Sequence, residues 1–206
     1  MPRIELQVPF TDKDEAKRLG ARWDSAARVW FVPEELDPQR FQRWLPADFT
    51  PNVRAPSYFI ATSARSCWRC ERTSPVHAFI LPSGHETLDS WGPGSDCAWE
   101  PGDEPTLLCY LDWLAPAVVA RITTLTRHYR VAYSHETDSF SWTNRCVFCD
   151  APFGDHETCC EPGQGFLAFT LEDARRVTLA HVDEPFAASC GSYSIGVTLF
   201  EEMRRL

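Results

Sequence analysis

Residues 67–70 read Cys-Trp-Arg-Cys, and residues 146–149 read Cys-Val-Phe-Cys. A Cys-x-x-Cys turn can present two thiolates to one metal ion, and four thiolates complete the tetrahedral shell of a structural zinc site. The predicted ligands are Cys67, Cys70, Cys146 and Cys149. We therefore expect one structural zinc ion and no other small-molecule cofactor.

The two cysteine pairs lie far apart, because 75 residues separate Cys70 from Cys146. A compact zinc ribbon uses a shorter spacing, so the chain must leave the metal site and return to it. Apolar residues recur at steps of three and four within Thr106–Leu114 and Pro116–His128, which is typical of helices. These patterns predict a zinc-ribbon-like α+β domain with a helical insertion.

The first fifty residues have their own pattern. Apolar residues alternate from Ile4 to Phe10 and predict a half-buried strand. A short helix should follow from Thr11 and end at Gly20, which can adopt a left-handed conformation. Residues 28–32 read as a second strand, and Asp37-Pro38 should begin a second helix that ends before Pro46. The predicted N-terminal unit is strand-helix-strand-helix.

Three prolines between Leu45 and Tyr58, without apolar periodicity, indicate a linker. We predict a small domain over residues 1–50, a linker over 51–57 and a zinc-binding domain over 58–206. The remaining expected elements of that domain are strands over 58–62, 76–81, 129–134 and 139–145, a surface loop over 84–105, a capped helix from Thr170 to Leu179 and a terminal helix over 193–206.

The chain carries 29 acidic and 20 basic side chains, which gives a formal net charge of −9. Residues 1–50 hold nine acidic and eight basic residues, so the acidity belongs mainly to the remainder. A broad grip on nucleic-acid phosphates needs clustered Lys and Arg, and the sequence contains no such stripe. The acidic excess also fits a cytosolic inhibitor or immunity-type protein that binds a basic protein partner.

The sequence favours a cytoplasmic location. Its start, Met-Pro-Arg-Ile-Glu-Leu, lacks the apolar core of a secretory leader. The most apolar stretch, residues 107–125, contains Asp112, Pro116 and Arg121, which argues against a membrane span. In a reducing compartment, Cys-x-x-Cys pairs among nine cysteines favour metal binding over disulfides. The spacing assigns no role to the other five cysteines: Cys97, Cys109, Cys159, Cys160 and Cys190.

Three segments of the N-terminal unit resemble a small bacterial domain of unknown function that accompanies plasmid-type primases and antirestriction proteins. They are Leu-Gln-Val-Pro-Phe, Asp-Lys-Asp-Glu-Ala-Lys-Arg-Leu-Gly-Ala-Arg-Trp-Asp and Val-Trp-Phe-Val-Pro. Some members of that family continue with two Cys-x-x-Cys pairs, a Gly-Asp and a Glu-Pro-Gly segment, to which Cys146–Cys149, residues 154–155 and residues 161–163 are similar. The resemblance implies the small fold and an association with nucleic acid.

Four residues of this unit form a candidate nucleic-acid surface. Arginines beside aromatic rings can stack an unpaired base, and the sequence offers this combination at Arg22, Trp23, Arg28 and Trp30. The alternative is that both tryptophans fill the small core of the unit.

Two polar segments are weaker candidates for catalysis. A cysteine near a histidine can become a nucleophilic thiolate, which draws attention to Asp155, His156, Cys159 and Cys160. A second group consists of His135, Glu136 and Asp138. Neither group matches the spacing of a known catalytic motif, so we do not expect an enzyme.

The sequence thus favours a non-enzymatic, zinc-stabilised binding or adaptor protein associated with nucleic acid or a nucleoprotein complex. Two alternatives stay open: the inhibitor or immunity-type protein, and a hydrolase or nuclease that uses the loop over residues 155–160.

Overall fold

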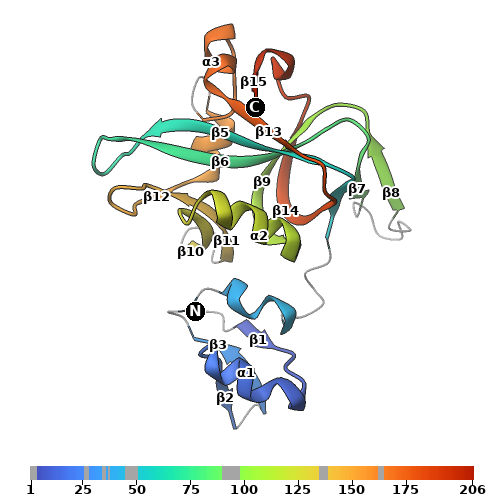
Figure 1. Ribbon diagram of the computed structural model, residues 1–206, viewed down its shortest axis with the longest axis vertical. Coiled ribbons are helices and arrows are strands. Elements are labelled where there is room, and N and C mark those ends of the chain that lie inside the picture. Colours follow the sequence, from blue (N-terminus) through green and yellow to red (C-terminus); the bar gives the residue numbers. More distant parts are fainter. Residues whose placement is uncertain are drawn as a thin grey trace. The chain divides into compact units, whose positions relative to one another are not determined.

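The computed structural model describes residues 4–25, 28–33, 36, 38–44, 51–89, 98–134, 139–161 and 165–206 (Figure 1). The chain separates into two compact units. One comprises Met1–Thr50 with Val131–Ser141, and the other comprises Pro51–Arg130 with Trp142–Leu206. The protein is a mixed, strand-rich structure with few helices.

The N-terminal unit contains a three-stranded antiparallel sheet in the order β1-β3-β2. Its elements are β1 (Ile4–Leu6), a 3-10 turn (Phe10–Asp12), α1 (Lys13–Arg18), β2 (Arg22–Asp24), β3 (Val29–Val32) and a 3-10 segment (Pro38–Trp44). Gly20 has a φ of 104° directly after α1, as predicted. The core of the unit comprises Leu6, Ala16, Ala21, Val32, Phe41 and Trp44.

The predicted strand-helix-strand-helix order differs from the structure at two points. The additional strand β2 pairs with β3, and the second helix has 3-10 geometry. β2 is only three residues long and follows α1 closely, so its alternation is too short to detect in the sequence.

The second unit is built on a nine-stranded sheet in the order β15-β13-β5-β6-β9-β14-β4-β7-β8. These strands are β4 (Val53–Ala55), β5 (Tyr58–Ser66), β6 (Thr73–Leu81), β7 (His85–Asp89), β8 (Ala98–Gly102), β9 (Thr106–Leu114), β13 (Thr178–Val182), β14 (Phe186–Ile195) and β15 (Arg204–Arg205). A smaller sheet, β10-β11-β12, comprises β10 (Tyr129–Ser134), β11 (Ser139–Arg145) and β12 (Pro152–Phe153). Helix α2 (Pro116–Leu125) joins β9 to β10, and α3 (Leu171–Arg176) precedes β13.

The strands predicted over 58–62, 76–81, 129–134 and 139–145 are all present. Helix α3 begins at the predicted cap, where the Thr170 side chain accepts a hydrogen bond from the backbone N–H of Asp173. It ends at Arg176, because Val177 is already extended and leads into β13. The surface loop predicted over 84–105 is wrong for residues 85–89 and 98–102, which form β7 and β8 and pair with each other.

The helix predicted over Thr106–Leu114 is wrong. This segment is strand β9, held between β6 and β14 near the middle of the sheet. Its first four residues are all buried and the segment is mostly apolar, so it shows no clear alternation, and periodicity alone cannot distinguish it from a helix. Among the described residues between the two cysteine pairs, the predicted helical insertion is therefore one helix, α2, within a set of strands.

The terminal helix predicted over Tyr193–Leu206 is also wrong. Tyr193 to Ile195 complete β14, and Gly196, with a φ of 72°, turns the chain away. A 3-10 turn (Phe200–Glu202) and β15 follow. Across the described segments, no helix is both long and apolar enough to cross a membrane.

Candidate metal centre

The two Cys-x-x-Cys segments form matching turns, one between β5 and β6 and the other between β11 and β12. Glu71 and Asp150, which follow the second cysteine of each turn, have φ values of 60° and 58°. Each turn is closed by two backbone hydrogen bonds. In the first turn, Glu71 N–H donates to Cys67 O (2.8 Å) and Cys67 N–H donates to Arg72 O (2.9 Å). In the second turn, Asp150 N–H donates to Cys146 O (2.9 Å) and Cys146 N–H donates to Ala151 O (2.8 Å). The same local structure therefore occurs twice.

The four sulfur atoms of these turns converge within 4.8 Å of one another. The Sγ atoms of Cys67 and Cys149 are 3.6 Å apart, and so are those of Cys70 and Cys146. A disulfide needs about 2.05 Å, whereas four sulfurs at 2.3 Å from a tetrahedral ion lie about 3.8 Å apart. The donor set and its spacing therefore fit a metal ion held by four cysteines.

The backbone of the turns favours negative charge on the sulfurs. Burial raises the pKa of Cys146, but the amides of Phe148 and Cys149 and the sulfurs of Cys70 and Cys67 together lower it to about 6. The pKa of Cys67 is likewise lowered by backbone amides, against the effect of burial. The amide of Ala151 lowers the pKa of Cys149, but burial and the neighbouring sulfurs raise it to about 12. The metal-free cluster thus retains a proton that a cation would displace.

Protein contacts hold the two turns together independently of any ion. The Asn144 side chain, just before the second turn, accepts a hydrogen bond from the backbone N–H of His77 (2.7 Å) and donates one to its carbonyl oxygen (2.8 Å). The backbone N–H of Val147 donates to Ser74 Oγ (3.1 Å). Because His77 and Ser74 belong to β6, which follows the first turn, these bonds fix β11 beside β6 and prearrange the sulfur cluster.

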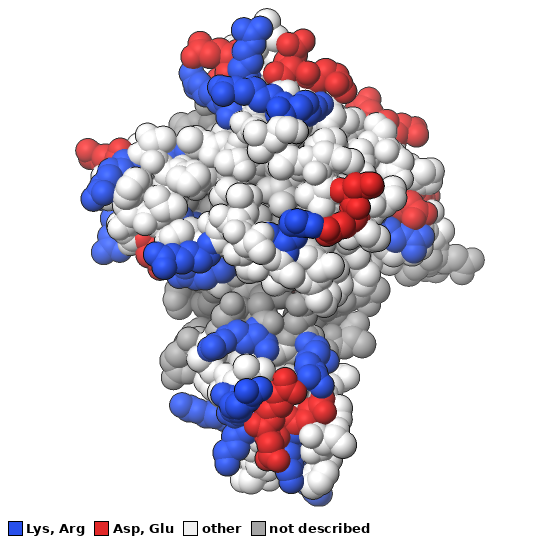
Figure 2. Space-filling view, in the orientation of Figure 1, with Lys and Arg blue, Asp and Glu red and all other residues white. Residues whose placement is uncertain are grey.

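Sequence reasoning does not single out the aromatic residues within the two turns. Trp68 is 66% exposed and Phe148 is 49% exposed. The indole N–H of Trp68 donates to the carbonyl oxygen of Pro152 (2.9 Å), and the guanidinium of Arg72 lies 4.5 Å from the Phe148 ring centroid. Figure 2 shows Lys and Arg side chains gathered where Figure 1 places the β5–β6 turn. An aromatic residue inside each Cys-x-x-Cys sequence is the signal that could have found them.

The candidate residues of the N-terminal unit are only partly brought together. Trp23 and Trp30 are paired across β2 and β3, with ring centroids 5.5 Å apart. Trp23 is 49% exposed, so the alternative that it fills the core is wrong, whereas Trp30 is half-buried against the core. Arg22 is exposed but alternates with Trp23 along β2, which places the two side chains on opposite faces. Arg28 is exposed in the turn before β3.

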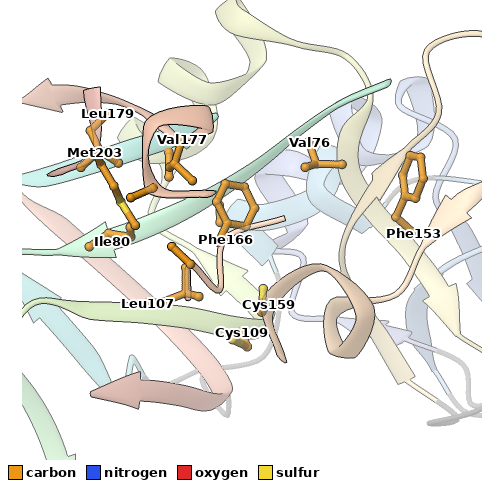
Figure 3. Packing of buried hydrophobic residues seen from close by; sticks show 14 of the residues in the cluster. Val76, Ile80, Leu107, Cys109, Phe153, Cys159, Phe166, Val177, Leu179 and Met203 are labelled. Carbon is orange, nitrogen blue, oxygen red and sulfur yellow. The ribbon is translucent and has the colours of Figure 1, made fainter. Parts of the chain in front are cut away.

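The candidate catalytic loop contains a π-helical turn, His156–Cys160. Asp155, which precedes it, accepts a hydrogen bond from the backbone N–H of Tyr110 (2.6 Å), a residue of β9 with a φ of 53°. The carboxylate thus satisfies a backbone donor in an irregular stretch of β9. His156 and Cys160 are exposed, whereas Cys159 is buried beside Cys109 (Figure 3).

The other candidate positions divide into buried and undescribed ones. Cys190 is buried, and its backbone N–H and carbonyl both bond to the Asn52 side chain. Cys97 and the group His135, Glu136 and Asp138 lie outside the described residues.

Asp155 should make the stability of the second unit depend on pH. Burial raises its pKa from 3.8 to about 6, against the opposing effect of the Tyr110 amide. A raised carboxyl pKa means that the folded state binds the proton more tightly, so this stabilising contribution is full below about pH 4 and is lost as the pH rises through 6. Each pKa unit corresponds to about 1.4 kcal/mol, and partial exposure of Asp155 reduces the total to about 2 kcal/mol. Asp155→Asn should therefore be more stable than wild type at pH 8, and the difference should shrink towards pH 5.

Urea unfolding of wild type and Asp155→Asn at each pH measures the difference in their free energies of unfolding. Any pH dependence that comes from metal binding is the same in both proteins, so it cancels in this difference. The groups that interact electrostatically with Asp155 are Tyr110, Tyr129, Cys159 and Cys160. Asp173→Asn is the control of opposite sign, because hydrogen bonds from Thr170 and Phe169 and the nearby Arg176 lower the pKa of Asp173. A variant-to-wild-type difference for Asp155→Asn that is constant from pH 5 to 8 would contradict the assignment.

Comparison with known proteins confirms the resemblance of the N-terminal segment. Residues 3–46 match the family described as Domain of unknown function (DUF5710). Two proteins of Escherichia coli named DNA primase TraC are 49% identical over 53 residues and 48% identical over 42 residues. These matches cover 26% and 20% of this chain, but only 5% and 3% of the primases. No solved structure matches the chain.

Proposed function

We propose that this chain is a non-enzymatic binding or adaptor protein, stabilised by zinc and associated with nucleic acid. The observation that carries the proposal is the convergence of four cysteine sulfurs within 4.8 Å. Sulfur ligands in a tetrahedral set select zinc or an iron–sulfur centre. A site filled by four thiolates offers no open position for a reacting water, so a zinc ion held by Cys67, Cys70, Cys146 and Cys149 would be structural.

In this proposal residues 1–50 form one domain, residues 51–57 connect it to the body, and residues 58–206 form the metal-binding domain. The split zinc-ribbon-like arrangement of that body is part of the proposal. It is supported by the matching turns on β5–β6 and β11–β12, which approach from distant parts of the sequence.

The N-terminal unit is the proposed nucleic-acid contact. The support is its similarity to segments of DNA primases and the half-exposed Trp23 ring beside Trp30. A flat exposed ring can stack an unpaired base whatever the base sequence. Arg28 lies in the turn between β2 and β3, where a guanidinium could reach a phosphate.

Trp23→Ala should weaken binding of single-stranded DNA about tenfold, since one base stack contributes roughly 1–3 kcal/mol. Fluorescence anisotropy with a labelled oligonucleotide at low salt measures the dissociation constant. Phe10→Ala is the matched control, because Phe10 is an aromatic residue of the same unit with an exposed fraction of 81%. Equal affinities of wild type and Trp23→Ala would remove this surface from the proposal.

The acidic excess of residues 51–206, with 20 acidic and 12 basic side chains, favours a second candidate, a protein that neutralises a basic partner. Co-purification from native extract separates the candidates. A stoichiometric basic protein that dissociates at high salt would support this one, whereas nucleic acid in the complex would support the first.

A further inference from the structure

The end of the second unit that carries the cysteine turns has the features of a binding surface in its own right. Trp68 and Phe148 project from the two turns, and the converging sulfurs place both turns at the same end. A single exposed aromatic residue is ordinary, whereas two that are carried by converging turns can form an apolar patch of the kind that marks a binding site. Neither ring belongs to the buried hydrophobic cluster of this unit, which includes Cys67 and Cys146.

Both rings are held in place by contacts between the turns. Trp68, from the first turn, donates its indole N–H to Pro152, which follows the second turn. Phe148, from the second turn, lies under the guanidinium of Arg72, which follows the first. An exposed ring that is already oriented loses less conformational freedom on binding, so these contacts prearrange the rings for a flat ligand.

The charge around the rings points to a polyanion. Residues 65–72 and 145–150 contain four arginines and two carboxylates, although the whole chain is acidic. One of the four, Arg65, is paired with Glu157 and Glu161 (3.5 Å each). Asp150 is paired with Arg130 (2.9 Å) and Arg145 (3.1 Å), which neutralise it. Arg69 and Arg72 are exposed, and within the described part of the chain neither has an ion-pair partner. Two of the four cysteines are buried and the other two are half-buried, whereas these arginines are exposed.

We propose that this end binds single-stranded nucleic acid, with unpaired bases stacked on Trp68 and Phe148 and phosphates contacted by Arg69 and Arg72. Stacking on aromatic rings combined with Arg contacts to the backbone is the chemistry by which proteins hold unpaired strands without reading their sequence. A duplex would hide the base faces that the rings require. This surface is separate from Trp23 and goes beyond the proposed function, because it does not require the N-terminal unit to bind.

The test uses the full zinc-loaded chain and a fluorescein-labelled oligodeoxythymidine of about 15 nucleotides, a length suited to such sites. Trp68→Ala should weaken binding about tenfold, while Trp68→Phe, which keeps a ring but loses the indole donor that orients it, should weaken binding less than Trp68→Ala. Phe169→Ala is the matched control, since Phe169 is 62% exposed on the same unit. Unchanged zinc content shows that the variants are folded.

The arginines have a different measurable effect. Each phosphate contact contributes about 0.7 to the slope of log affinity against log salt for a single strand. Arg69→Gln should lower that slope by about 0.7, whereas Trp68→Ala should weaken binding and leave the slope unchanged. Arg176→Gln, at an exposed position of α3, is the control.

The outcomes separate the two proposed surfaces. If Trp68→Ala and Arg69→Gln bind as wild type while Trp23→Ala does not, the inference is overturned and the N-terminal surface stands. If the reverse holds, the inference stands and the N-terminal surface fails. Equal affinity for duplex and single-stranded DNA would also overturn the inference. So would binding of an acidic peptide at the cysteine turns by a protein that binds no oligonucleotide.

Discussion

Cys146→Ser will lower the metal content and the thermal stability together. Cys146 is fully buried, and its Sγ lies 3.6 Å from that of Cys70 in the four-sulfur cluster. A metal site of this kind scarcely exists in the unfolded chain, so its binding free energy, on the order of 10 kcal/mol in small zinc peptides, becomes folding free energy. That is comparable to the whole stability of a domain, about 5–15 kcal/mol. Losing one ligand should therefore unfold much of the second unit.

Elemental analysis and thermal unfolding of the purified protein measure the two effects. Cys159→Ser and Cys160→Ser are the matched controls, because these cysteines lie outside the four-sulfur cluster and should leave the metal in place. The assignment is wrong if wild type carries less than about half an equivalent of zinc per site, or if Cys146→Ser retains a full equivalent.

Asn144→Leu should destabilise the second unit by about 4 kcal/mol, the cost of leaving two buried backbone groups unpaired at roughly 1–3 kcal/mol each. The Asn144 side chain accepts a hydrogen bond from the backbone N–H of His77 and donates one to the His77 carbonyl oxygen. His77 lies in the part of β6 that precedes the residues paired with β9. Leu has a similar volume but no polar atoms, so the hydrogen bonds are lost while the packing is kept. Chemical unfolding with zinc in excess measures the loss.

Asn52→Leu provides the control, because Asn52 makes the same two-bond contact with the backbone of Cys190, far along the chain from the cysteine turns. Both variants should be destabilised, but Asn144→Leu alone should also bind zinc more weakly, since it loosens the approach of the two turns. Equal zinc affinity in the two variants would contradict the view that Asn144 prearranges the site.

The four-cysteine cluster could be predicted because each half of it is local. A Cys-x-x-Cys turn is visible in four residues, and the pairing of two such turns follows from the chemistry of the ligand. The contacts that prearrange the site are not local. Asn144 and His77 lie 67 residues apart in sequence. The sequence around an asparagine does not show whether its side chain bonds to a distant backbone or is solvated.

The fold was predictable where one face of an element is buried and alternation or capping residues mark it, as in β5 or at Thr170. It was not predictable for β9, which lies between β6 and β14 and begins with four buried residues in a row, so that no alternation marks it as a strand. Ile195, Leu199 and Met203 have helical spacing, but Leu199 has a φ of 57° and Ile195 is largely exposed. There the spacing is coincidental, and glycine at position 196 decides the local structure.

The 75 residues between Cys70 and Cys146 also determine how long after the first cysteine turn the second one is synthesised. At about 5–20 residues per second, a ribosome needs roughly 4–15 seconds to make that stretch. Throughout this interval the nascent chain presents one cysteine turn with two ligands and no partner. A metal ion held by all four cysteines would therefore bind late in synthesis, and until then the thiols of the first turn would be exposed to competing metals and oxidants.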